Sequence, residues 1–257
     1  MRHVEFPALE TCALCDRRAP LQRSHLLPNF LIRRLRGESG RFYAASLPQK
    51  PLQAGPMARL LCFGCEQRLS RWEDQVKRVF YPDTRQARLP IKYDTWLQLF
   101  SLSISWRALT FLKHSTPNPH AALSTAAQRL LLQTLPGEVH ERAEQRRLLW
   151  GKALLADAAP PNQNDQHLIF LNGANFPHEY SGVVGFTVCH TQSLTGVFAQ
   201  LGPICILGTL RDERPLDWSN TRVQSLGGKF HAAKQTIPES FGDWLKGYFA
   251  NIAEIET

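Results

Sequence analysis

The 257-residue sequence predicts an α+β fold in two parts, a small cysteine-containing domain over residues 1–92 and a helical domain with an antiparallel β-sheet over residues 93–257. Two C-x-x-C pairs in a polar, arginine-rich stretch indicate the first part. Long helical patterns, followed by short apolar runs bounded by Gly, Asn and Pro, indicate the second. A hydrophobic content of 43% is sufficient for cores of this size.

The net charge of +8 is concentrated in the first part of the chain. Residues 1–92 carry 17 Lys and Arg against 8 Asp and Glu, a net of +9, whereas residues 93–257 carry 13 against 14, a net of −1. A concentrated positive field attracts polyanions, of which nucleic acid is the commonest. The alternative is a solvated basic face that has no partner.

The cysteine pairs stand in "TCALC" and "LLCFGC", with residues 16–61 between them. Each C-x-x-C pair can chelate one edge of a tetrahedral zinc ion, so two pairs supply a complete set of ligands. We therefore expect one structural Zn²⁺ bound by Cys12, Cys15, Cys62 and Cys65. A redox role would explain each pair only separately, and neither pair lies in a thioredoxin-like βαβ context.

No run of 18 apolar residues occurs in the sequence, and its first ten residues lack the apolar core of a secretory signal. We therefore expect a cytoplasmic protein with no membrane partner. In a reducing compartment, paired cysteines bind metal more often than they form permanent disulfides.

A helix is predicted directly after the second cysteine pair, because residues 65–81 contain neither Gly nor Pro. Glu66 and Glu73 fall together at one edge of its apolar stripe, and Arg71 points toward solvent. A cysteine knuckle, a hairpin that contains His25 of "SHLLP", and a second cysteine pair in the first turn of a helix make a treble-clef arrangement.

Together, the C-x-x-C pair, "SHLLP" and "LLCFGCE" resemble the HNH endonucleases (His-Me finger nucleases) that contain a structural zinc, over about residues 10–82. The resemblance implies a ββα-metal fold that hydrolyses nucleic-acid phosphodiester bonds. It also implies that His25 is the general base that activates water, and that Mg²⁺ or a similar cation is held between the hairpin and the helix. We expect a nucleic-acid partner, with DNA as the first choice.

Two departures from the family pattern leave the cation ligands open. Ser24 stands where the family commonly has an acidic or histidine ligand, and the family's middle Asn has no counterpart before the second cysteine pair. Glu66 and Glu73 are therefore the candidate oxygen ligands. In the alternative interpretation, His25 only stabilises the hairpin, Glu73 pairs with Lys77, and the domain is a catalytically inactive zinc module that binds nucleic acid or a protein.

Several arginines are candidates for phosphate contacts, because phosphates are bound largely by Arg and Lys. Three of them end a short helix after "LLPNFLI", and two more lie on the helix after the second cysteine pair. The predicted nucleic-acid-binding residues are Arg33, Arg34, Arg36, Arg68 and Arg71.

The second part shows no catalytic motif, so we expect it to select a target or bind a protein partner. By analogy with the family, the expected setting is bacterial defence. Its expected elements are a buried helix over residues 93–114, helices over 119–135 and 138–156, a β-meander over 168–210 and a C-terminal helix whose apolar stripe packs on the sheet. Arg107 lies within the buried helix, where an unpaired charge is costly. We expect it to pair with an acid in the core or to reach an interface.

Overall fold

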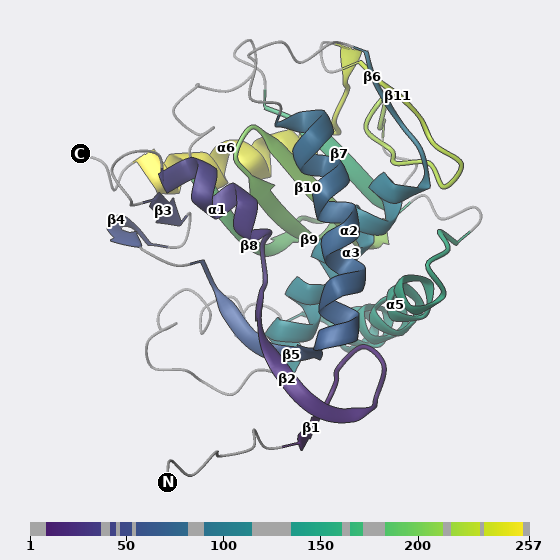
Figure 1. The fold of residues 1–257 in the computed structure, drawn as a ribbon. Helices are drawn as coiled ribbons and strands as arrows, with labels where there is room; N and C mark the ends of the chain where they lie inside the picture. The colour runs from purple at the N-terminus through teal and green to yellow at the C-terminus, as the bar shows by residue number, and fades with distance from the viewer. Residues whose placement is uncertain are drawn as a thin grey trace, which may run out of the picture.

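The computed structural model describes residues 9–36, 42–44, 47–52, 55–81, 90–114, 135–160, 165–171, 183–212, 217–231 and 234–253. These residues form five helices and three sheets in which nearly all strand pairs are antiparallel (Figure 1). The predicted α+β class is confirmed. No helix within the described ranges is long and apolar enough to cross a membrane.

The N-terminal sheet consists of β1 (Leu9–Thr11), β2 (Arg18–His25) and β5 (Met57–Cys62), in the order β1-β2-β5. Helix α1 (Asn29–Arg36) follows β2, and α2 (Phe63–Phe80) begins directly after β5. The α2 helix buries the predicted apolar stripe against this sheet and against the rest of the chain. The order of a knuckle, two antiparallel strands and a helix is that of a treble clef.

A six-stranded sheet has the order β4-β3-β8-β9-β10-β7. The predicted meander is formed by β8 (Val183–His190), β9 (Leu194–Leu201) and β10 (Ile204–Asp212), and β7 (Gln166–Phe170) pairs with β10. The other edge comes from the first part of the chain. There β3 (Phe42–Ala44) runs parallel to β8 and antiparallel to β4 (Leu47–Leu52).

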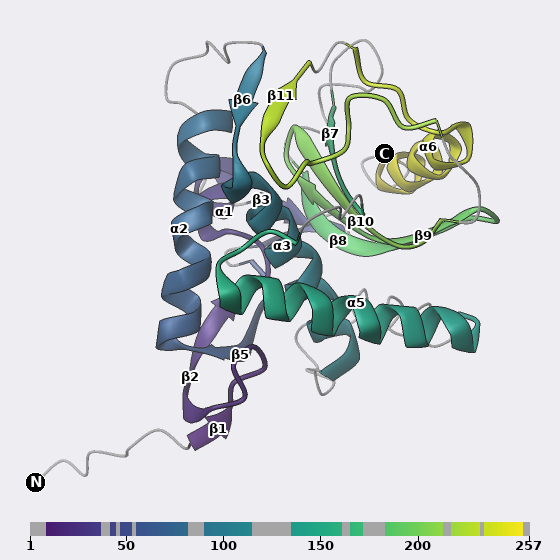
Figure 2. The ribbon, with the colours of Figure 1, turned by 90° about the vertical axis from the view of Figure 1, so that its right-hand side faces the viewer.

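Helices cover both faces of the six-stranded sheet (Figure 2). On one face lies α6 (Glu239–Ala253), whose stripe of Phe241, Leu245 and Phe249 packs on the strands as predicted. On the other face lie α3 (Thr95–His114) and α5 (Gly137–Ala156). The α3 helix is buried almost throughout, as its apolar sequence predicts, because it contacts α2, α5 and the sheet.

One hydrophobic core crosses the boundary that the sequence predicts near residue 92. It contains Cys12 and Leu69 from the first part together with Phe100, Leu154 and Phe230 from the second. A two-stranded sheet of β6 (Ile91–Tyr93) and β11 (Gly228–Phe230) also joins distant segments. The two parts are therefore connected by packing as well as by the chain. The helix predicted over 119–135 lies outside the described residues, apart from Leu135.

Candidate functional site

The four predicted zinc ligands form one cluster, because their Sγ atoms all lie within 4.8 Å of one another. Cys12 and Cys15 belong to the knuckle between β1 and β2, Cys62 ends β5, and Cys65 lies in the first turn of α2. The Sγ atoms of Cys15 and Cys62 are 3.8 Å apart. This is the S–S edge of a tetrahedron with Zn–S bonds of ~2.3 Å, about 3.8 Å, and far exceeds a disulfide bond of ~2.05 Å.

Backbone contacts hold this cluster together. The Cys62 amide donates to the Cys12 Sγ at 3.3 Å, and the Ala13 amide donates to the Leu60 carbonyl at 2.9 Å. Burial raises the pKa of the Cys65 thiol, so a bound cation would be needed to favour its thiolate. Among the described residues, these cysteines make the only group of three or more His, Cys, Asp or Glu side chains placed to hold a metal ion. The cluster can therefore bind zinc.

His25 is the last residue of β2, where it lies opposite Met57 of β5 and is half-buried. Burial has the largest effect on its imidazole and lowers the pKa below its ordinary value. The Glu66 carboxylate opposes this shift, and three guanidinium groups add to it, those of Arg107, Arg33 and Arg23. The ring is consequently a neutral base at pH 7 in a positively charged environment.

Glu66 lies in the first turn of α2, directly after Cys65. Its Oε2 atom is buried and has no hydrogen-bond partner among the described residues. Leaving such an acceptor unpaired costs about 1–3 kcal/mol. A carboxylate at this position also stabilises a positive charge on the His25 ring, because it raises the pKa of that imidazole.

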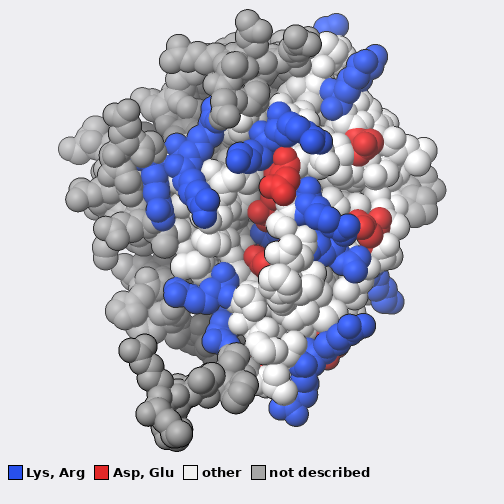
Figure 3. Space-filling view, viewed as in Figure 1, with Lys and Arg blue, Asp and Glu red and all other residues white. Residues whose placement is uncertain are grey.

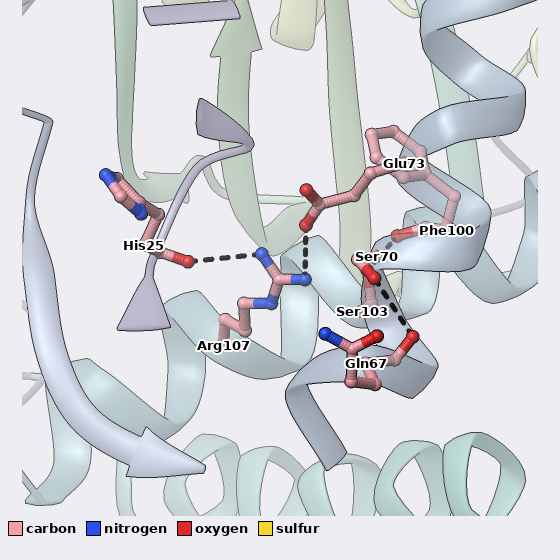
Figure 4. Close-up of polar contacts among 7 residues, drawn as sticks. All are labelled: His25, Gln67, Ser70, Glu73, Phe100, Ser103 and Arg107. Atoms are coloured by element: carbon pink, nitrogen blue, oxygen red, sulfur yellow. Dashed lines mark hydrogen bonds and ion pairs between the residues drawn. The ribbon is translucent and has the colours of Figure 1, made fainter. Parts of the chain in front are cut away.

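Glu73 is engaged by Arg107 of α3, which reaches between β2 and α2 (Figure 4). The Arg107 Nη2 lies 2.5 Å from the Glu73 Oε1, and its Nη1 donates to the His25 carbonyl oxygen at 3.1 Å. The Arg107 side chain is 1% exposed and that of Glu73 is 16% exposed. The prediction that Arg107 pairs with an acid in the core is confirmed. The His25 ring points away from this ion pair.

Two of the residues between the end of β2 and α2 are poor ligands for the divalent cation that the family resemblance implies there. A guanidinium already lies between the end of β2 and α2, and Glu73 neutralises it. Ser24 is fully buried and offers only a neutral hydroxyl, a weak ligand for Mg²⁺.

The five predicted phosphate-binding arginines have different environments. Arg68 donates to the Leu155 carbonyl at 2.7 Å and Arg71 pairs with Asp157 at 2.9 Å, so both tie α2 to the end of α5. Arg34 donates to the Tyr81 carbonyl at 3.3 Å. Arg36 is partly buried. Arg33 is exposed and acts electrostatically on His25, which makes it the best placed of the five for a phosphate there.

Sequence reasoning missed Arg23. It is exposed, and it shares with His25 the electrostatic environment described above. The sequence contained a signal for this role, because Arg23 and His25 are two residues apart, and side chains at that spacing on a strand lie on the same face. Figure 3 shows Lys and Arg side chains spread over the face that carries α1 and α2, with Asp and Glu between some of them. His25 thus lies in a positively charged environment on β2, the strand in which Leu21 is in register with Cys62 of the cysteine cluster.

No family model matches the chain, and neither a curated protein nor a solved structure matches it. The likeness to HNH endonucleases accordingly stays a prediction that rests on the motifs in residues 10–82.

Proposed function

We propose that this protein is a zinc-stabilised nuclease in which His25 removes a proton from the nucleophile that attacks a phosphodiester. The observation that carries the proposal is the half-buried His25 side chain at the end of β2, on the strand that also carries the exposed Arg23 and in the electrostatic field of the exposed Arg33. An imidazole that titrates near neutrality is an effective general base. Guanidinium groups bind phosphate oxygens and offset the charge that develops in the transition state.

The other residues of the site support these roles. Glu66 stabilises the imidazolium that forms when His25 accepts a proton. The cysteine cluster, with zinc bound, fixes the C-terminal end of β5 and the first turn of α2, which contains Glu66. Arg107 fixes the His25 backbone through its carbonyl group.

A second candidate function is nucleic-acid binding without cleavage. The buried guanidinium of Arg107 favours it, because a cation-dependent nuclease needs room for its cation between β2 and α2. A binding module would retain the zinc cluster and the basic surface and would use His25 only as a structural residue. Cleavage assays of His25 variants separate the two functions.

We expect His25→Ala to lower kcat by at least about 100-fold with a change in KM of less than about threefold, because general-base catalysis typically contributes 10²–10⁴-fold. In the unmodified protein, kcat/KM should rise with pH with its midpoint below pH 6.5, since the pKa of His25 in the free protein is lowered from that value. Gel assays of nucleic-acid cleavage over a pH series measure the kinetic constants of the variant and the pH dependence of the unmodified protein. Equal rates for the variant and the unmodified protein would remove His25 from catalysis.

Arg33→Gln should weaken nucleic-acid binding and reduce the slope of log affinity against log salt by about one, the value for one lost phosphate contact. Lys246→Gln on α6 is the matched control, since it removes one exposed cation that pairs with Asp243 in another part of the fold. Fluorescence anisotropy with a labelled oligonucleotide at several salt concentrations measures the slopes. The same slope for both variants would show that Arg33 makes no specific contact.

A further inference from the structure

We propose that the substrate is single-stranded RNA, and that its own 2′-hydroxyl is the nucleophile, so that cleavage needs no divalent cation. This inference rests on the proposed nuclease function and replaces DNA, the partner that the sequence analysis favoured. Three observations carry it: the position of Arg107, the set of charges around His25, and an exposed phenylalanine at the start of α2.

The Arg107 guanidinium lies between the end of β2 and α2, where the family resemblance implies a cation (Figure 4). It is almost completely buried, and it binds both the Glu73 carboxylate and the His25 carbonyl. Burial keeps it away from substrate, so it cannot polarise a water molecule or contact a leaving group. We therefore infer a reaction at His25 that uses a general base and exposed guanidinium groups without a divalent cation.

A general base and guanidinium groups without a divalent cation are poorly suited to the hydrolysis of DNA. Attack of water on a phosphodiester requires activation of a weak nucleophile and stabilisation of a poor leaving group, which nucleases commonly achieve with divalent cations. RNA differs because each phosphate has a 2′-hydroxyl beside it. An intramolecular nucleophile gains the large effective concentrations of an oriented neighbouring group, so a general base and local positive charge become sufficient.

Cleavage of RNA can proceed with His25, the two exposed arginines and Glu66. The His25 imidazole takes the 2′-hydroxyl proton as the bond between O2′ and phosphorus forms. The bond between phosphorus and O5′ breaks, and the departing O5′ takes a proton from water. The hydroxide that remains takes the proton from the His25 imidazolium, which restores the neutral base. The products are a strand that ends in a 2′,3′-cyclic phosphate and a strand that begins with a 5′-hydroxyl. Arg23 and Arg33 offset the extra negative charge on the phosphate oxygens, while Glu66 stabilises the imidazolium.

Phe63 provides a contact for an unpaired base. Its side chain is 63% exposed although it lies in the core-forming α2 helix, between two cysteines of the cluster. Positions 63 and 66 are three residues apart and so are neighbours on the helix surface, which places Phe63 one turn from Glu66. Exposed aromatic rings stack on bases of single strands, and attack by O2′ requires a flexible strand because a duplex holds this oxygen out of line.

The test compares three labelled oligonucleotides of the same sequence: RNA, RNA with a single 2′-deoxyribose, and DNA. Each is incubated with the full-length protein either in EDTA or with Mg²⁺, and the zinc content of the protein is measured after incubation. We expect RNA to be cut equally well with and without Mg²⁺, with 2′,3′-cyclic phosphate ends identified by mass spectrometry. The 2′-deoxyribose should block cleavage at its own position, and DNA should remain intact.

Two variants complete the design. His25→Ala, purified identically, controls for contaminating ribonuclease, and its zinc content and circular dichroism show whether it is folded. Phe63→Ala should weaken RNA binding by about fivefold or more, the lower end of the contribution of base stacking. Cleavage that requires Mg²⁺, cuts DNA, or leaves 5′-phosphate ends would overturn the RNA proposal while the nuclease function stands. No cleavage of any substrate by folded, zinc-loaded protein would overturn both.

Discussion

Removal of zinc is expected to unfold the N-terminal sheet and the first turns of α2, and to lower the stability of the whole protein. Structural zinc sites contribute on the order of 10 kcal/mol of folding free energy. In Cys65→Ser only three thiolates remain, and we expect a loss of at least ~4 kcal/mol. For a chain of this size that corresponds to a decrease in Tm of about 10 °C or more. Differential scanning calorimetry measures the change in Tm, and metal analysis measures the zinc content of the variant.

The chain offers a matched control for this prediction. Cys189 is a buried cysteine of the six-stranded sheet and lies outside the cluster. Cys189→Ala should keep one zinc per chain, and it should cost only the packing of one small side chain, about 1–2 kcal/mol. Less than about half an equivalent of zinc per chain, in unmodified protein never exposed to chelator, would contradict the four-cysteine site.

Arg107→Met is expected to destabilise the protein by about 3–5 kcal/mol, because it leaves the Glu73 carboxylate buried without its partner. The His25 carbonyl loses the donor that lies 3.1 Å away in the same variant. We therefore expect the His25 end of β2 to loosen as well. Urea unfolding gives the free energy, and hydrogen exchange of the residues that follow His25 reports the loosening.

Two further variants separate the charge effect from simple loss of contacts. The double variant Arg107→Met, Glu73→Leu removes both charges and should recover most of the lost stability, since apolar pairs can replace buried ion pairs. Arg71→Ala breaks the exposed pair with Asp157, whose side chains are 61% and 38% exposed, and should cost less than about 1 kcal/mol. A double variant as unstable as Arg107→Met would show that the unpaired carboxylate is not the cause.

The cysteine cluster could be predicted from the sequence because each C-x-x-C pair is a local feature whose chemistry does not depend on the rest of the fold. The burial of α3 and the stripe of α6 were predictable for a similar reason, since helical periodicity is read over a few turns. For Arg107, the sequence indicated a partner in the core but not its identity. Glu73 is 34 residues away, and only the packing of α3 against α2 brings the two together.

Other features depend on tertiary packing and had no local signal. Arg68 and Arg71 have the spacing of exposed helix residues, and nothing in their neighbourhood indicates that the end of α5 lies against them. The pairing of β3 with β8 joins residues on either side of the predicted boundary. Sequence patterns show which face of an element is apolar, but they do not show which other element covers it.

The parallel pairing of β3 with β8 also has a consequence for protein synthesis. Tyr43 is in register with Val183, so about 140 residues must be translated after β3 before its partner strand exists. At ~5–20 residues per second, this delay is on the order of ten seconds. During that time the N-terminal segment cannot complete its native packing, and its basic surface is already outside the ribosome. The native contacts of the N-terminal segment with β8 therefore form only after most of the chain has been made.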